Sequence, residues 1–219
     1  NELIELRNAI STAGQSDVSQ FPSVKLGTEY RNRFLTINPP ASSGTLQTSE
    51  PYNITISNGN EQDDVQIPTR FIEYQPRYFE ITVGSTWYEH SVLYLDDRNR
   101  ESGLSIIEDQ NIVRNDNVRI TALQNSFQKT DTGRVTLELY PQQQLTADDF
   151  PEGQNLTVTV PTRLEATEYW DDALDDSDEI YRGVDSQAHA ADVHALTLSV
   201  DSEDLRVNTV GIQTEPDEN

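Results

Sequence analysis

The most constraining feature of this sequence is a series of short runs in which apolar and polar residues alternate. The clearest run is Leu156–Val160 (LTVTV), which places its apolar side chains on one face of an extended strand and its threonines on the other. Tyr52–Ile56, Val118–Ala122 and Leu196–Val200 alternate in the same way. Turn signals such as the Ser-Asn-Gly-Asn segment at 57–60 separate the runs. The pattern predicts a mainly β fold, an antiparallel β-sandwich or barrel-like head.

One longer run, Trp87–Leu95, has apolar residues on parts of both faces. This distribution is typical of a strand that is covered on both sides. We therefore expect a single strand in the centre of a sheet. His90 lies within this run beside aromatic residues, where a half-buried histidine with satisfied hydrogen bonds is favoured over a catalytic base.

Two segments have the helical rather than the strand period. Leu3, Leu6 and Ile10 recur at helical spacing near the start of the chain, and a second apolar stripe recurs at i, i+3, i+4 and i+7 within 165–174. We expect the following organisation: an N-terminal helix at 1–14, a polar linker at 15–23, and a single β-rich domain at 24–219 that contains the second helix and an acidic connector at 175–192.

The predicted N-terminal helix begins without a capping signal, because no Ser, Thr or Asp precedes its first apolar residue. We interpret it as the continuation of a membrane or filament helix that lies upstream of Asn1. Leu3, Leu6 and Ile10 would then face neighbouring helices and drive assembly. The alternative is an amphipathic helix that packs on the domain and frays at its start.

The chain carries 38 acidic and 15 basic residues, a net charge of −23, and Lys25 and Lys129 are its only lysines. This balance excludes nucleic acid as a direct partner, because phosphate binding needs basic side chains, and it disfavours anionic membrane surfaces. An acidic, lysine-poor composition resembles that of proteins from extreme halophiles, in which salt screens the self-repulsion. An acidic protein from an ordinary source is the alternative. The absence of cysteine excludes disulfides and thiolate metal sites.

Four segments carry a resemblance to a known group: ELRNAISTAG, VKLGTEYRNRFLTINPPASSGTLQT at 24–48, YEHSVLY, and VTVPTRL followed by an acidic helix. The chain resembles uncharacterised haloarchaeal exported proteins with one N-terminal membrane helix, similar in layout to archaeal type IV pilin-like proteins. This resemblance implies a non-enzymatic extracellular domain at the cell surface, anchored in the membrane by an upstream segment. It also implies self-association or contacts with other cell-surface proteins. We expect no cofactor.

Two other classes of function are weighed against this one. The first is a tethered β-sandwich that binds a glycan, an ion or a cell-envelope protein. The second is a secreted hydrolase, which the sequence disfavours because it has no nucleophile elbow, no phosphate-binding loop and no zinc-protease motif. We therefore expect no catalytic residues.

Candidate calcium ligands occur at Asp97, Asn99, Glu101 and Glu108, where the spacing partly matches that of a calcium loop. The glycine at 103 comes one place late and no helices flank the segment, so a solvated hairpin turn is favoured.

A second possible metal set is His189, Asp192 and His194. The five-residue spacing of its histidines suits neither one face of a helix nor one face of a strand. The acidic run Asp171–Glu179 could gather hydrated cations, but a solvated charged face is favoured. We therefore expect no specific metal site.

Asn53 and Asn155 each begin an N-x-T motif, the acceptor pattern for N-glycosylation. Both are expected to be exposed, on the strand face opposite the apolar residues. A set of aromatic residues is also close in sequence, and we interpret it as core and sheet-face residues rather than as a sugar-stacking platform. Its members are Tyr74, Tyr78, Phe79, Trp87, Tyr88 and Tyr94.

We expect the thermal unfolding midpoint to rise steeply between about 0.1 and 2 M KCl, because the Debye length falls from about 10 Å to a few ångström over this range. Circular dichroism melts at a series of KCl concentrations measure this dependence. A flat profile would contradict the halophilic assignment.

Overall fold

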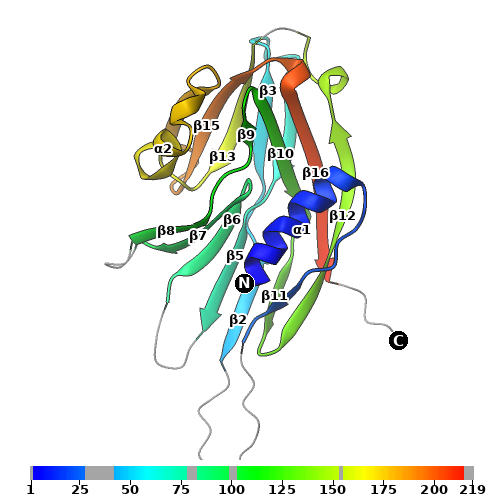
Figure 1. Cartoon of the computed structure of the whole chain (residues 1–219), viewed down its shortest axis with the longest axis vertical. Helices are drawn as coiled ribbons and strands as arrows, with labels where there is room; N and C mark the ends of the chain where they lie inside the picture. Colours follow the sequence, from blue (N-terminus) through cyan, green and yellow to red (C-terminus); the bar gives the residue numbers. More distant parts are fainter. Residues whose placement is uncertain (1, 28–41, 78–82, 99–102, 153–154, 215–219) are drawn as a thin grey trace, which may run out of the picture.

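The computed structural model describes residues 2–27, 42–77, 83–98, 103–152 and 155–214, and it confirms a mainly β fold, with 56% of residues in strands (Figure 1). Most of the chain folds into three sheets, and one helix lies across the lower part of the molecule in this view. No helix among the described residues is long and apolar enough to cross a membrane.

The sheets are called I, II and III here. Sheet I has the order β1 (Ser23–Lys25), β12 (Arg134–Leu145), β16 (Leu205–Thr214), β10 (Asn117–Gln124) and β9 (Val113–Arg114). Sheet II has the order β11 (Gln128–Asp131), β2 (Ser43–Thr48), β5 (Ile72–Arg77), β6 (Ser85–Glu89), β7 (Val92–Asp97) and β8 (Gly103–Glu108). Sheet III has the order β14 (Tyr181–Ala190), β15 (Val193–Val200), β13 (Leu156–Thr162), β3 (Tyr52–Ser57) and β4 (Val65–Thr69).

The helical elements are few and short apart from the first. They are α1 (Glu2–Ser16), the π-helical turn η2 (Ala166–Trp170) with α2 (Asp171–Ala173), and the 3-10 turns η1 (Ala147–Asp149), η3 (Asp175–Ser177) and η4 (Ser202–Asp204). The second helix predicted at 165–174 therefore exists, but it is small and irregular.

The described strands pair antiparallel with one exception. β10 and β16 run parallel, with Val118 opposite Leu205 at one end and Gln124 opposite Gly211 at the other. The alternating run of β13 behaves as predicted, since Leu156, Val158 and Val160 are buried while Thr157 is exposed.

Two clusters of buried apolar residues stabilise the fold. One lies between strands of all three sheets and includes Trp170, Tyr94 and Val158. The other lies beneath α1 and includes Leu6, Ile10 and Leu137. Because burial of apolar surface is the main favourable term in folding, these two clusters are what hold the sheets and the helix together.

α1 packs its apolar face on sheet I, against β12, β1 and β16. Leu6 is 2% exposed and Ile10 is fully buried. Leu3 is partly buried and packs against the same cluster. Gly14 permits the close approach, because a Cβ at this position would come within 3.0 Å of the Thr121 side chain. The expectation that Leu3, Leu6 and Ile10 face neighbouring helices is thus corrected: they contact their own domain, as in the packed alternative.

Two expected connections are also corrected. The polar linker at 15–23 begins inside α1, and Gln20 exchanges backbone hydrogen bonds with Leu139, so this segment extends sheet I. The acidic connector at 175–192 contains β14, a ten-residue strand at the edge of sheet III. Most of β14 is solvent-exposed, so it lacks the apolar alternation that marks a half-buried strand.

Replacing Ile10 with alanine should lower the free energy of unfolding by about 2–5 kcal/mol, because it leaves a cavity between α1 and sheet I. Urea unfolding in about 2 M KCl measures the loss. Glu5→Ala, an exposed position on the same helix, is the matched control and should change stability by less than about 0.5 kcal/mol. Equal stability of the two variants would show that α1 is not part of the folded core.

Candidate functional site

The candidate site is built around the turn between β6 and β7. Glu89 pairs with Val92, so the hairpin loop consists of His90 and Ser91 alone. Both residues have positive φ, 43° and 73°, as a two-residue hairpin turn of type I′ requires. The single strand predicted at 87–95 is therefore two strands, and the prediction was wrong because a His-Ser pair lacks the Asn-Gly or Asp-Gly signal of such turns.

Contacts from three other parts of the chain hold this turn. Arg7 on α1 donates from Nε to the Ser91 carbonyl oxygen at 2.6 Å. The backbone N–H of Asn111 donates to the Ser91 hydroxyl at 2.7 Å. His90 donates from Nε2 to the Pro161 carbonyl oxygen at 2.7 Å. Because a left-handed backbone costs about 1 kcal/mol or more per non-glycine residue, the turn persists only where such contacts determine it.

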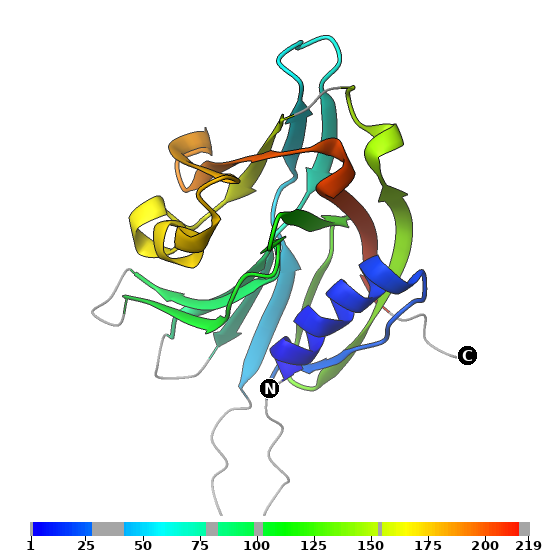
Figure 2. The same ribbon diagram turned by 45° about the horizontal axis from the view of Figure 1, so that its top comes forward.

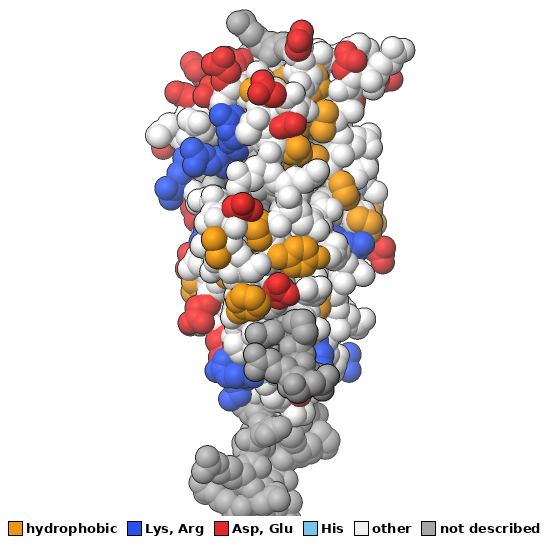
Figure 3. All heavy atoms as spheres, turned by 90° about the vertical axis from the view of Figure 1, so that its right-hand side faces the viewer, with side chains coloured by type: hydrophobic (Ala, Val, Ile, Leu, Met, Phe, Trp, Pro, Cys, Tyr) orange, Lys and Arg blue, Asp and Glu red, His pale blue; other side chains and the backbone are white. Residues whose placement is uncertain are grey.

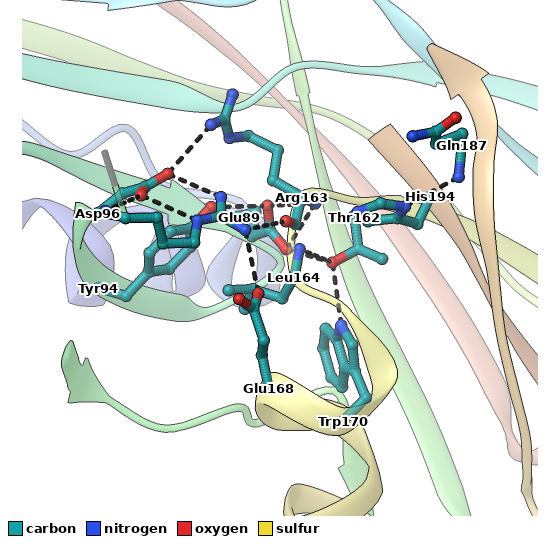
Figure 4. Close-up of polar contacts among 11 residues, drawn as sticks. Glu89, Tyr94, Asp96, Thr162, Arg163, Leu164, Glu168, Trp170, Gln187 and His194 are labelled. Atoms are coloured by element: carbon teal, nitrogen blue, oxygen red, sulfur yellow. Dashed lines mark hydrogen bonds and ion pairs between the residues drawn. The ribbon is translucent and has the colours of Figure 1, made fainter. Parts of the chain in front are cut away.

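Glu89, the residue before the turn, is fully buried and is the centre of a polar cluster (Figure 4). Its carboxylate accepts hydrogen bonds from the Thr162 hydroxyl, from the Arg163 backbone N–H at 3.0 Å and from the Tyr94 hydroxyl at 3.1 Å. Burial raises the pKa of Glu89, and the hydrogen bonds and the nearby Arg163 charge act in the opposite direction. Glu89 thus joins sheet II to the end of β13 in sheet III.

Thr162 extends this cluster to the helical turn that follows β13. Its hydroxyl oxygen accepts from Trp170 Nε1 at 3.0 Å and from the Leu164 backbone N–H at 3.1 Å. The indole ring is fully buried in the main core, so the one polar atom of its ring is satisfied by this bond. Glu89, Tyr94, Thr162 and Trp170 are called the Glu89 cluster below.

A layer of charged groups covers the Glu89 cluster. Asp96 accepts from Arg98 Nε and Nη2 at 2.9 and 2.7 Å and from Arg163 Nη2 at 3.2 Å. Arg98 also forms an ion pair with Glu168 at 3.0 Å, and the Arg163 guanidinium lies 3.8 Å from the centre of the Trp87 ring. Burial raises the pKa of Asp96, but the hydrogen bonds and charge of Arg98, together with Arg163, outweigh it and hold this pKa below its usual value.

This charged layer forms one wall of a pocket of about 300 Å³. The opposite wall comes from the hairpin of β14 and β15. We call this the His194 pocket, and its lining consists of Asp96, Arg98, Arg163, Glu165, Gln187, Ala191, Asp192 and His194. In Figure 4, Asp96 and Arg163 lie on one side and His194 with Gln187 on the other.

His194 is 4% exposed, and its Nδ1 accepts a hydrogen bond from the Gln187 backbone N–H at 2.9 Å. The acceptor role of Nδ1 places the proton of the neutral ring on Nε2, so the imidazole offers an N–H donor from its other side. Gln187 has a φ of 59° and lies where the register between β14 and β15 shifts, which turns its N–H toward the ring.

The structure places the two described calcium candidates, Asp97 and Glu108, apart. Asp97 pairs with Gly103 at one end of the β7–β8 hairpin, and Glu108 pairs with Leu93 at the other. Glu108 lies five positions along β8 from Gly103, roughly 16 Å, which is too far for one calcium ion to bind both Asp97 and Glu108. Asn99 and Glu101 lie outside the described residues.

The other acidic and histidine candidates also remain apart. His189 lies edge-on to the Tyr52 ring, with 6.2 Å between ring centres, whereas His194 uses its Nδ1 lone pair within the protein. The run Asp171–Glu179 contributes to an open acidic cleft beside Asp116. Within the described part of the chain, no group of three or more His, Asp or Glu residues is placed to hold a metal ion.

The glycosylation candidates are both exposed, as predicted. Asn53 lies on β3 and donates from Nδ2 to Gln66 at 3.1 Å, and Asn155 precedes β13. Of the aromatic set, Tyr88 and Tyr94 are buried, Trp87 is half-buried under Arg163, and Tyr74 donates to the Leu26 carbonyl oxygen at 3.0 Å. Tyr78 and Phe79 lie outside the described residues.

Comparisons of the chain with protein-family models, with curated proteins and with solved structures gave no match. The assignment of function therefore depends on the sequence and on the geometry of the molecule.

Thr162→Val should lower the free energy of unfolding by about 2–4 kcal/mol, because it removes one donor to Glu89 and leaves the buried Trp170 N–H without an acceptor. Urea unfolding in about 2 M KCl measures this loss. Thr157→Val, at an exposed position of the same strand, is the control and should be nearly neutral. A neutral Thr162→Val would show that the Glu89 cluster contributes little to stability.

Burial lowers the pKa of His90 to about 4. The hydrogen bond to the Pro161 carbonyl oxygen opposes this shift but is the smaller effect. Between about pH 6.5 and 4 the unfolded chain takes up a proton at this residue while the folded protein does not, so the His90 contribution to stability is lost as pH falls through this window.

In the variant His90→Asn, the new residue tolerates the left-handed backbone and has no side chain that titrates. The difference in unfolding free energy between the native protein and this variant should shrink by about 3 kcal/mol from pH 6.5 to 4. Urea unfolding at intervals of half a pH unit measures it. A difference independent of pH would mean that His90 takes up its proton over the same pH range in the folded and the unfolded protein.

Proposed function

We propose that this chain is a non-enzymatic domain of a membrane-anchored surface or assembly protein that stands outside the cell in a high-salt environment. The order of a helix followed by a β-rich head agrees with the pilin-like layout that the sequence resembles, and the anchor would be supplied by a segment preceding Asn1. The acidic, lysine-poor composition supports the high-salt setting.

The observation that carries this proposal is the position of the exposed large apolar side chains. Among the described residues these are Val18 and Phe21, 58% and 53% exposed, and Ile106 and Ile107, 40% and 37% exposed. We call the first pair the Phe21 patch and the second pair the Ile106 edge. They lie on opposite sides of the molecule, because β8 is at the left and the segment after α1 is at the right in both ribbon views (Figures 1 and 2).

Each patch lies on the border of a sheet. The Ile106 edge belongs to β8, the last strand of sheet II, and an edge strand presents unpaired backbone groups to a partner. The Phe21 patch lies on the segment beside β12, and hydrophobic side chains gather along the middle of the face turned to that side (Figure 3). Exposed apolar residues at sheet borders favour contacts with another protein.

The occupant that we propose is a second copy of this chain. Two copies of net charge −23 repel each other, so a contact between them needs surface with few charges and salt to screen the rest. β8 meets the first condition, since Glu108 is its only ionisable residue. Patches on opposite sides join copies head to tail, an arrangement that extends as a row of molecules.

Sedimentation velocity in about 2 M KCl tests this contact. The native protein should show an average mass that rises with concentration, whereas Ile106→Lys with Ile107→Lys and, separately, Val18→Ser with Phe21→Ser should remain monomeric. Thr157→Lys introduces the same charge at an exposed position away from both patches and should associate like the native protein. A native protein that stays monomeric up to about millimolar concentration, or unchanged association of both double variants, would overturn the proposal.

A second candidate function, a tethered binding module, is favoured by the His194 pocket.

A further inference from the structure

We propose that the His194 pocket binds a small, neutral, polyhydroxylated ligand of the size of a single sugar ring. The inference starts from its volume of about 300 Å³, at the lower end of the range for ligand pockets, and from its lining, in which polar side chains predominate. It does not depend on self-association, since neither the Phe21 patch nor the Ile106 edge contributes to the lining.

The pocket offers a fixed hydrogen-bond donor. His194 is nine-tenths buried or more, its Nδ1 is occupied by Gln187, and its protonated Nε2 has no hydrogen-bond partner among the described residues. A ligand oxygen that accepts from this N–H would therefore meet a ring whose tautomer and orientation are already set.

The pocket also offers free acceptors. Glu165 and Asp192 are exposed at its border, and neither side chain forms an ion pair or hydrogen bond with another described residue. A hydroxyl group can donate to one of these carboxylates and accept from His194 at the same time, which a purely donating or purely accepting ligand cannot do.

The two arginines do not make the pocket an anion site. Arg98 is engaged by Asp96 and Glu168, and Arg163 pairs with Asp96 through Nη2 and stacks on the Trp87 ring, while its buried Nε has no hydrogen-bond partner among the described residues. With their charges paired, the lining keeps the excess negative charge of Glu165 and Asp192, which disfavours a phosphate or a carboxylate.

A metal ion fits the pocket no better. His194 presents an N–H and not a lone pair toward the ligand, and no set of three His, Asp or Glu residues in the described ranges is placed to hold a metal. Neutral hydroxyl groups remain as the ligand chemistry that uses both the donor and the acceptors.

The walls are held in place without a ligand. Arg163 is fixed through its backbone N–H to the buried Glu89 and through its guanidinium to Asp96, and Gln187 is fixed by its bond to His194. Such preorganisation reduces the conformational entropy lost on binding. No open aromatic face lies in the lining, so hydrogen bonds must supply most of the affinity, and we expect dissociation constants in the millimolar range.

Isothermal titration calorimetry in about 2 M KCl tests the proposal with glucose, galactose, mannose and glycerol as neutral probes. Glucuronate, glucosamine and CaCl₂ serve as anionic, cationic and metal probes. At least one neutral probe should bind, and the Glu165→Ala, Asp192→Ala double variant should weaken that binding by at least about tenfold, as expected for the loss of hydrogen bonds to charged groups. His194→Phe should abolish it, and His194→Gln, which keeps an N–H donor, should restore part of it.

Asp178→Asn, which changes an acidic residue outside the pocket, is the matched control and should bind like the native protein. Because His194 is buried, far-ultraviolet circular dichroism must first show that its variants fold, and the double variant tests the site independently since both of its residues are exposed. Absence of binding by every neutral probe, binding by glucosamine, glucuronate or calcium alone, or binding that survives the double variant would each overturn the proposal.

Discussion

The structure depends on the satisfaction of one buried carboxylate. A carboxylate without partners in a protein interior costs several kcal/mol, so Glu89 is compatible with the fold only while Thr162, Arg163 and Tyr94 donate to it. These donors come from two sheets, and the geometry of one sheet relative to the other is therefore specified by hydrogen bonds as well as by packing. Apolar contacts tolerate small shifts of one sheet over another, whereas these bonds do not.

The two residues that follow Glu89 also depend on hydrogen bonds from distant parts of the chain. His90 and Ser91 adopt a backbone that few side chains favour, and contacts from α1, from the segment before β9 and from β13 hold them there. Arg163 connects the buried carboxylate to the surface. Its backbone N–H donates to Glu89, and its side chain lines the His194 pocket. The interior and the proposed binding surface are thus one continuous set of contacts.

Sequence patterns could predict the parts of the fold that depend on local periodicity. The alternation of Leu156–Val160 predicted β13, and the spacing of Leu3, Leu6 and Ile10 predicted α1, because burial on one face imposes those periods. The partner of the buried helix face could not be predicted, because packing on a neighbouring helix and packing on the chain's own sheet require the same apolar stripe. The exposed edge strand β14 was missed because solvent exposure leaves no alternation to detect.

Most of the candidate site could not be predicted from the sequence, because its residues come together only in the folded structure. Glu89 lies more than seventy positions from Thr162 and Arg163, and nothing in the local sequence of either segment marks them as partners. The His-Ser pair of the turn also gave no turn signal, so a single strand was predicted for Trp87–Leu95. His194 was considered as a metal ligand, but the bond that sets its tautomer comes from a register shift in β14 that only the three-dimensional pairing reveals.

The place of β16 in sheet I has a consequence for how the molecule is formed. This last strand lies between β12 and β10, and its parallel partner β10 precedes it by almost ninety residues. Sheet I therefore cannot close until the residues of β16 are available, and pairings so distant in sequence slow folding because the loop must be closed before the contacts form. Until β16 is in place, β10 and β12 expose open edges and apolar faces, so the period before it docks is when the chain is most prone to aggregate.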